Sequence, residues 1–142
     1  MSEHYAIVVA RFYGSLAERL VAGAQAGFAA GGASDIDIFD VPGAFELPFA
    51  AQACAQSGRY AGVACLGAVI RGETDHYDIV CAETARGIQE VQLRTGVPCG
   101  FGVLTIETMD QGVARSGGGT RDTGRQAAEA VLALRAIQRR LG

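Results

Sequence analysis

Four short apolar runs, separated by stretches with helical periodicity, constrain the fold of this chain more than any other feature. Each run is rich in β-branched residues and indicates a buried strand. The runs span residues 5–10, 35–39, 62–70 and 98–106. Strands that alternate with helices form right-handed βαβ units, whose helices cover both faces of a parallel sheet. The sequence therefore predicts an α/β three-layer sandwich with a four-stranded parallel sheet.

Three helical segments each carry an apolar stripe that would pack on this sheet. The first stripe comprises Leu16, Leu20, Ala24 and Phe28. The second comprises Tyr77, Val80, Cys81, Thr84, Ile88 and Val91. A last helix is predicted over residues 123–141, after a glycine-rich loop at residues 116–122. Its stripe comprises Ala127, Val131, Leu134, Ile137 and Leu141.

Composition indicates one globular domain over residues 1–142. Hydrophobic residues make up 49% of the chain and charged residues 19%, which argues against disorder, and the net charge of -3 argues against nucleic-acid binding. The longest apolar run, residues 61–70, is about half of the ~20 residues that a membrane span needs, and residues 1–5 lack the basic start of a signal peptide. We therefore expect a cytoplasmic protein without membrane or nucleic-acid partners.

The spacing of the cysteines disfavours a metal or redox site, and the lack of lysine excludes a Schiff base with a protein amine. The four cysteines are far apart in apolar segments, without the CxxC pair of metal and redox sites, so buried free thiols are expected. All twelve basic residues are arginines. Without lysine, the chain has no side-chain amine that could form a Schiff base with a carbonyl substrate. Any imine chemistry must use an amine of the substrate.

Polar, glycine-rich turns follow the first three predicted strands, at residues 11–15, 40–46 and 71–75. Ligands of doubly wound sheets bind at the carboxyl ends of the strands. The third turn lies in the stretch GAVIRGETDHYDIVCA, residues 67–82, which joins an apolar strand, a glycine turn and a polar helix start. The amides of a first helical turn lack partners within the helix, and the helix dipole adds positive charge there. This turn is therefore a candidate anion site.

His76 follows that turn and is the candidate for proton transfer, because an unperturbed imidazole titrates near pH ~6.5. A surface or core histidine without function is the alternative. Cys81, five residues further on, would allow a Cys/His pair, but it falls on the apolar stripe of its helix, and core packing accounts for it better. The junction therefore predicts proton-transfer chemistry on a small phosphorylated molecule.

Three further residues each have a structural and a functional interpretation. Phe12, directly after the first strand, is either a core aromatic displaced into a loop or a platform for a flat ring. Glu46 is either a carboxylate favoured by the helix dipole or an acceptor for substrate hydroxyls. Arg115 is either a solvated side chain or a bidentate phosphate ligand. ATP and dinucleotide binding are disfavoured, since neither a GxGxxG motif nor a complete phosphate-loop motif occurs.

The segments VVARF, VPGAFELP, GAVIRGETDHYDIV and GFGVLTIET, in this order and spacing, resemble the lumazine synthase family over nearly the whole chain. The resemblance implies a flavodoxin-like fold. It also implies the condensation of 5-amino-6-(D-ribitylamino)uracil with 3,4-dihydroxy-2-butanone 4-phosphate to 6,7-dimethyl-8-ribityllumazine, phosphate and water. The 5-amino group of the first substrate can attack the ketone itself, so a chain without lysine can catalyse this reaction, and neither a metal nor an organic cofactor is called for.

The resemblance further implies roles for individual residues. His76 matches the proton donor, and Phe12 matches the residue that stacks on the pyrimidine. The segment that contacts the ribityl chain corresponds to Ala44, Phe45 and Glu46, and the ring would be lined by Ala68, Val69 and Ile70. The residues that match the binding site of the butanone phosphate are Glu73, Thr74 and Arg115. Phe101 would enter from a neighbouring subunit.

Two departures from the family pattern concern phosphate binding and assembly. Many relatives carry a lysine after the matched arginine, where this chain has Thr123, so Arg121 or Arg125 is expected to supply the missing charge. Only about four residues precede the first strand, whereas some relatives use an N-terminal strand to build hollow shells from pentamers. We expect at least a homopentamer with active sites at subunit interfaces. A non-catalytic flavin- or lumazine-binding assembly is the alternative, and a flavodoxin-like electron carrier is a third possibility.

Overall fold

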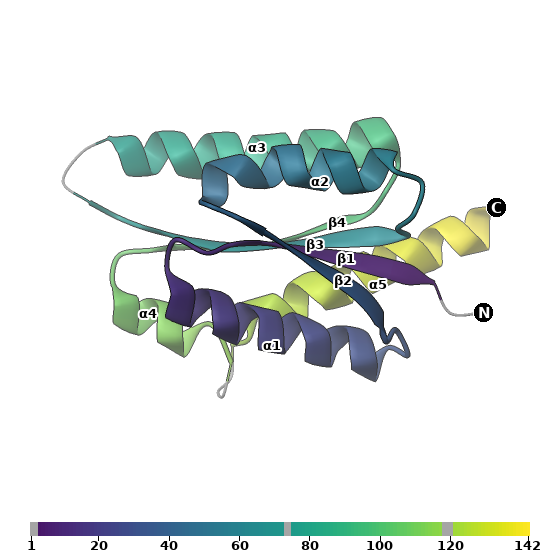
Figure 1. The fold of residues 1–142 in the computed structure, drawn as a ribbon, viewed down its shortest axis with the longest axis horizontal. Coiled ribbons are helices and arrows are strands. Elements are labelled where there is room, and N and C mark those ends of the chain that lie inside the picture. Colours follow the sequence, from purple (N-terminus) through teal and green to yellow (C-terminus); the bar gives the residue numbers. More distant parts are fainter. Residues whose placement is uncertain (1–2, 73–74, 118–120) are drawn as a thin grey trace.

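The computed structural model describes residues 3–72, 75–117 and 121–142. Within them the chain forms a four-stranded parallel sheet in the order β2-β1-β3-β4. The strands are β1 (His4–Ala10), β2 (Asp35–Val41), β3 (Gly62–Ile70) and β4 (Cys99–Ile106). One face is covered by α2 (Leu47–Gln56) and α3 (His76–Thr95), and the other by α1 (Gly14–Ala30), α4 (Met109–Ala114) and α5 (Thr123–Leu141) (Figure 1). The predicted flavodoxin-like α/β sandwich is confirmed.

Strand β1 divides the core in two, because successive side chains of a strand point to opposite faces of the sheet. Ile7 and Val9 belong to the core under α1 and α5, whereas Ala6 and Val8 belong to the core under α2 and α3. All four side chains are fully buried. Burial on both faces explains why the run is apolar throughout rather than alternating.

Strand β2 departs from the prediction of a buried strand. It lies at the edge of the sheet and pairs with β1 among the described strands. None of its seven residues is buried, and Ile38 and Phe39 are both exposed. An apolar run shows that a segment is extended, but it does not show whether neighbouring strands and helices cover it, so the prediction of burial was wrong here.

The last helix also differs from its predicted stripe. Ala127 and Val131 are buried in the core, but Ile137 and Leu141 are exposed. Figure 1 shows why: the C-terminal end of α5 runs out past the strands, so the outer part of the stripe has no sheet beneath it. Helix α4 was not predicted, since its six residues are too few to show a helical period. Among the helices of the described residues, none has the length and hydropathy needed to cross a membrane.

Candidate active site

A pocket of about 610 Å³ opens at the carboxyl ends of β1 and β3. Four segments build it: the loop after β1, the short helix η1 (Ala44–Glu46) after β2, the end of β3, and the first turns of α3. Its lining is mostly apolar and aromatic, as is usual for a site that takes a flat organic molecule. The lining residues are Phe12, Tyr13, Gly43, Ala44, Phe45, Glu46, Ala68, Val69, Ile70, Gly72, His76, Tyr77, Ile79 and Val80.

Eight of the residues singled out in the sequence therefore meet in one cavity. They come from segments that are far apart in the sequence: Phe12, Ala44, Phe45, Glu46, Ala68, Val69, Ile70 and His76. Five further lining residues were not predicted as such, namely Tyr13, Gly43, Tyr77, Ile79 and Val80. Each of these is a direct neighbour of a predicted site residue or lies one helical turn from His76. That spacing was the available signal.

Phe12 lies in the loop after β1 and is 75% exposed, so it is not a core aromatic. Its ring meets that of Tyr13 edge to face, with the ring centroids 4.9 Å apart. Leaving so large an apolar surface in contact with water is unfavourable unless something covers it. Of the two interpretations of Phe12, this placement favours the platform for a flat ring.

Glu46 closes the turn at the start of η1. Its Oε1 accepts a hydrogen bond of 3.0 Å from the backbone N–H of Gly43, which completes a capping arrangement around the turn. Glu46 therefore has a structural role in this turn. An ionised carboxylate has about four acceptor positions, so this one bond leaves capacity for a substrate hydroxyl at the same side chain.

His76 is the first residue of α3 and is exposed on the pocket. Gly72 lines the pocket beside it. The predicted phosphate turn can be followed only in part, because Glu73 and Thr74 lie outside the described residues. The described residues place the N-terminal end of α3, with its partial positive charge, at the rim of the cavity.

Cys81 does not line this pocket in the described part of the chain. It is partly buried and packs against the core under α2 and α3. Burial raises the pKa of its thiol, so less of the reactive thiolate is present at neutral pH. The Cys/His nucleophile pair is therefore disfavoured, and core packing accounts for Cys81.

Phe101 and Arg115 stand apart from the pocket formed by the described residues. Phe101 is half exposed on β4, the edge strand opposite β2. Arg115 ends α4, on the face of the sheet away from α3 (Figure 1). Arg121 and Arg125 also lie outside the lining, and the guanidinium of Arg125 pairs with Glu129 at 3.4 Å.

Within residues 3–72, 75–117 and 121–142, no three histidine, cysteine, aspartate or glutamate side chains lie close enough together to hold a metal ion. All four cysteines are free, as predicted, and three of them are buried. The chemistry available in the pocket comes from an imidazole, a carboxylate, a helix N-terminus and aromatic faces.

A flavodoxin-like sheet with a pocket at the strand ends, a stacking ring and an imidazole beside a helix N-terminus defines a class of enzymes that act on small, flat, anionic substrates. The 6,7-dimethyl-8-ribityllumazine synthase family model matches residues 2–139. A 6,7-dimethyl-8-ribityllumazine synthase of Salinibacter ruber is 42% identical over 139 residues, which cover 96% of this chain and 89% of that protein. The protein of the same name from Desulfatibacillum aliphaticivorans is 46% identical over 117 residues, 81% of this chain and 76% of its own.

The chain therefore belongs to the 6,7-dimethyl-8-ribityllumazine synthase family. It is an enzyme of riboflavin biosynthesis and a transferase.

Proposed function

We propose that the pocket condenses 5-amino-6-(D-ribitylamino)uracil with 3,4-dihydroxy-2-butanone 4-phosphate, which yields 6,7-dimethyl-8-ribityllumazine, phosphate and water. One observation carries the proposal: a chain of this family gathers the matched residues of three distant sequence segments in a single apolar cavity. The segments contribute Phe12, then Ala44 to Glu46, and then Ala68 to Ile70 with His76.

The pyrimidine binds against Phe12, whose exposed ring offers a face for stacking. Ala68, Val69 and Ile70 line the ring at the end of β3. The ribityl chain extends along Ala44, Phe45 and Glu46, where the carboxylate of Glu46 accepts hydrogen bonds from its hydroxyls. The flat part of the substrate thus meets apolar surface and its polyol meets the polar turn.

The butanone phosphate binds at the N-terminal end of α3, where the amides of the first turn and the helix dipole favour an anion. Glu73 and Thr74 are part of this proposed phosphate site. His76, at the same helix end, donates and accepts the protons of the reaction. Arg115 pairs with the phosphate through its guanidinium.

The reaction proceeds without a protein amine. The 5-amino nitrogen of the pyrimidine attacks the ketone, and one water is lost to form an imine. Phosphate leaves by elimination, the resulting enol becomes a ketone, and the ribitylamino nitrogen attacks this carbonyl to close the second ring, with loss of a second water. His76 exchanges protons with the intermediates at these steps. Holding both substrates in one geometry supplies a large part of the acceleration, since proximity contributes roughly 7 to 11 kcal/mol in favourable cases.

A neighbouring subunit completes the site in this proposal. Phe101 and Arg115 lie away from the pocket of their own chain, and β4 presents Phe101 at an exposed edge of the sheet. We propose a ring of subunits, a pentamer or a multiple of it, in which these two residues reach the pocket next door. Such a ring uses a head-to-tail interface that closes on itself.

Turnover tests the reaction directly. Purified protein mixed with both substrates is expected to produce lumazine fluorescence well above the uncatalysed background. Binding of the pyrimidine without such an increase would contradict the proposal and indicate the non-catalytic alternative instead. Yellow protein with tightly bound flavin would indicate an electron carrier.

Mixed rings test the shared site. His76→Ala and Arg115→Ala are each expected to be nearly inactive alone. Co-expressed in equal amounts, the two variants regenerate about a quarter of the wild-type sites, because each intact site takes His76 from one subunit and Arg115 from its neighbour. Activity that stays at the level of the single variants contradicts a site shared between subunits. Light scattering on the same samples reports the assembly, and a monomer would contradict the ring.

A further inference from the structure

The two loops at the rim of the pocket begin in the same way. Arg11 follows β1 and Arg71 follows β3. The backbone N–H of Arg11 donates to the carbonyl of Val41 on β2 at 2.9 Å, and that of Arg71 donates to the carbonyl of Ile106 on β4 at 2.8 Å. Each arginine is therefore the last residue anchored to a neighbouring strand before the chain turns towards the pocket.

Each guanidinium then spans the neighbouring strand and the helix that follows. Arg11 donates from Nε to Asp40 Oδ1 at 2.8 Å and from Nη1 to Glu18 Oε1 at 2.9 Å. Asp40 belongs to β2, and Glu18 lies on α1, seven residues after the arginine.

Arg71 repeats this arrangement on the other side of β1. Its Nε donates to Glu107 Oε1 at 3.0 Å, directly after β4, and its Nη2 lies 3.6 Å from Asp78 Oδ1. Asp78 is on α3, again seven residues after the arginine. The Cζ of Arg71 also lies 4.3 Å from the ring centroid of Tyr77, which lines the pocket.

The residues enclosed by these contacts are those that the reaction uses. Phe12 lies between Arg11 and Glu18, and His76 lies between Arg71 and Asp78. Neither α1 nor α3 has a side-chain cap on its first turn in the described residues, whereas Thr108 caps α4 and Asp122 caps α5. The two arginines thus fix the first turns of α1 and α3, whose N-cap residues make no side-chain hydrogen bond to the helix.

Global stability does not account for these contacts. The six charged side chains are between 32% and 77% exposed, and ion pairs between exposed side chains contribute little to the free energy of folding. A planar guanidinium with several donors is nevertheless suited to holding two carboxylates and an aromatic face in a fixed arrangement.

We propose that Arg11 and Arg71 are positioning residues of the active site, Arg11 for Phe12 and Arg71 for His76. The inference rests on the proposed function, since it assigns each arginine to one substrate-contacting residue. Loss of Arg11 then weakens binding of the pyrimidine, and loss of Arg71 slows proton transfer. Loss of Arg11 is thus expected to change KM, and loss of Arg71 is expected to change kcat.

Steady-state kinetics of Arg11→Gln and Arg71→Gln test this assignment. We expect Arg71→Gln to lower kcat about tenfold with little change in KM, and Arg11→Gln to raise KM for the pyrimidine about fivefold with little change in kcat. Both variants are expected to keep thermal midpoints within about 2 °C of wild type. Arg86→Gln is the matched control, because Arg86 pairs with Glu83 on α3 at 3.1 Å, outside the pocket lining of the described residues.

Arg71→Lys and Arg11→Lys keep the charge and serve if the glutamine variants fold poorly. A lysine ammonium cannot hold two carboxylates in the fork geometry, so each is expected to show the same kind of defect as its glutamine variant. Wild-type kcat in both Arg71 variants, or wild-type KM in both Arg11 variants, overturns the inference, provided that wild type makes product. An inactive wild type refutes the proposed function instead.

Discussion

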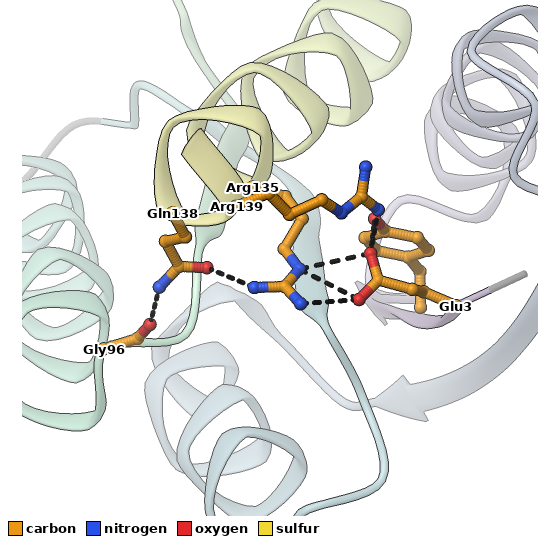
Figure 2. A network of polar contacts seen from close by, with 6 residues as sticks. Glu3, Gly96, Arg135, Gln138 and Arg139 are labelled. Carbon is orange, nitrogen blue, oxygen red and sulfur yellow. Dashed lines mark hydrogen bonds and ion pairs between the residues drawn. The ribbon is translucent and has the colours of Figure 1, made fainter. Parts of the chain in front are cut away.

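The two ends of the sheet use the same contact, arginine with carboxylate, for different purposes. At the amino end, Glu3 accepts hydrogen bonds from Arg135 Nε at 3.0 Å and from Nη2 at 2.6 Å, and it also accepts one from Arg139 (Figure 2). Gln138 continues the network by donating to the carbonyl of Gly96 (Figure 2). At the carboxyl end, Arg11 and Arg71 begin two of the loops that lead to a largely apolar pocket.

The difference lies in what each network ties together. Glu3 joins the start of the chain to its last helix, and the hydrogen bond from Arg135 lowers the pKa of its carboxyl to about 2. Arg11 and Arg71 each tie the end of one strand to a carboxylate on or just after the neighbouring strand, beside the loops that lead to Phe12 and His76. The same chemistry therefore stabilises the fold at one end, and we infer that it orders the active site at the other.

The two histidines of the chain test this comparison most directly, because they lie at opposite ends of the sheet. His4 is 3.4 Å from Asp35 and 3.6 Å from Asp37 at the amino end, whereas His76 lines the pocket. We expect His76→Ala to lower kcat about 100-fold or more, since general acid-base catalysis contributes at least this much. His4→Ala should leave kcat nearly unchanged. A loss of only a few fold in His76→Ala would make this residue an orienting group.

Phe12 tests the binding side of the pocket. Phe12→Ala is expected to raise KM for the pyrimidine about five- to tenfold, because stacking contributes ~0.5 to 1.5 kcal/mol beyond area burial. Its effect on stability should be small, since the side chain is exposed. Phe49→Ala is the matched control, because Phe49 is also exposed but lies on α2 beside another hollow. Equal values of KM in the two variants would show that Phe12 does not contribute to binding of the pyrimidine.

Glu3 tests the amino end, where the expected effect is smallest. Glu3→Gln should lower the free energy of unfolding at pH 7 by about 1 kcal/mol, a value kept low because its side chain is 26% exposed. The pKa of Glu3 in the folded state is below its ordinary value of 4.5, so the stabilisation is present above pH 4.5 and is lost as the pH falls towards 2.

Urea unfolding of wild type and Glu3→Gln at pH 7, 5 and about 3.5 measures this difference. The difference should be constant at the two higher values and smaller at the lowest. Activity should be unchanged throughout the range where both proteins are folded. A difference that does not depend on pH would contradict the assignment of the low pKa to Glu3.

Much of the fold could be predicted from the sequence, because strands and helices follow from local periodicity. The bounds of β3 and α5 agree with the predictions, and β1 and β4 differ by one residue. The burial of β2 and the outer stripe of α5 were mispredicted, since burial depends on what lies opposite. The sequence shows no recognisable pattern for helix α4. The contacts of Arg11 with Glu18 and of Arg71 with Asp78 were not predicted either.

The placement of Phe12 and His76 in the pocket was predictable, because Phe12 lies just after β1, His76 lies after the turn that follows β3, and parallel strands bring their carboxyl ends together. The roles of Phe101 and Arg115 follow only from the family resemblance, which implies that Phe101 enters from a neighbouring subunit. Neither residue lines the pocket formed by the described residues of its own chain, a placement that no local pattern shows.

The sequence by itself determined three features: the alternation of strands and helices, the polar turns at the strand ends, and the absence of a lysine nucleophile. The first two depend on neighbouring residues only, and the third depends on composition. The tertiary structure decided which of those turns share a cavity. That outcome depends on the parallel register of β1 and β3. Close packing between distant residues also fixes α5 against α1, as at Gly124, where an added Cβ would clash with the backbone carbonyl of Leu20. Contacts of this kind join residues about a hundred positions apart, a separation that no local pattern encodes.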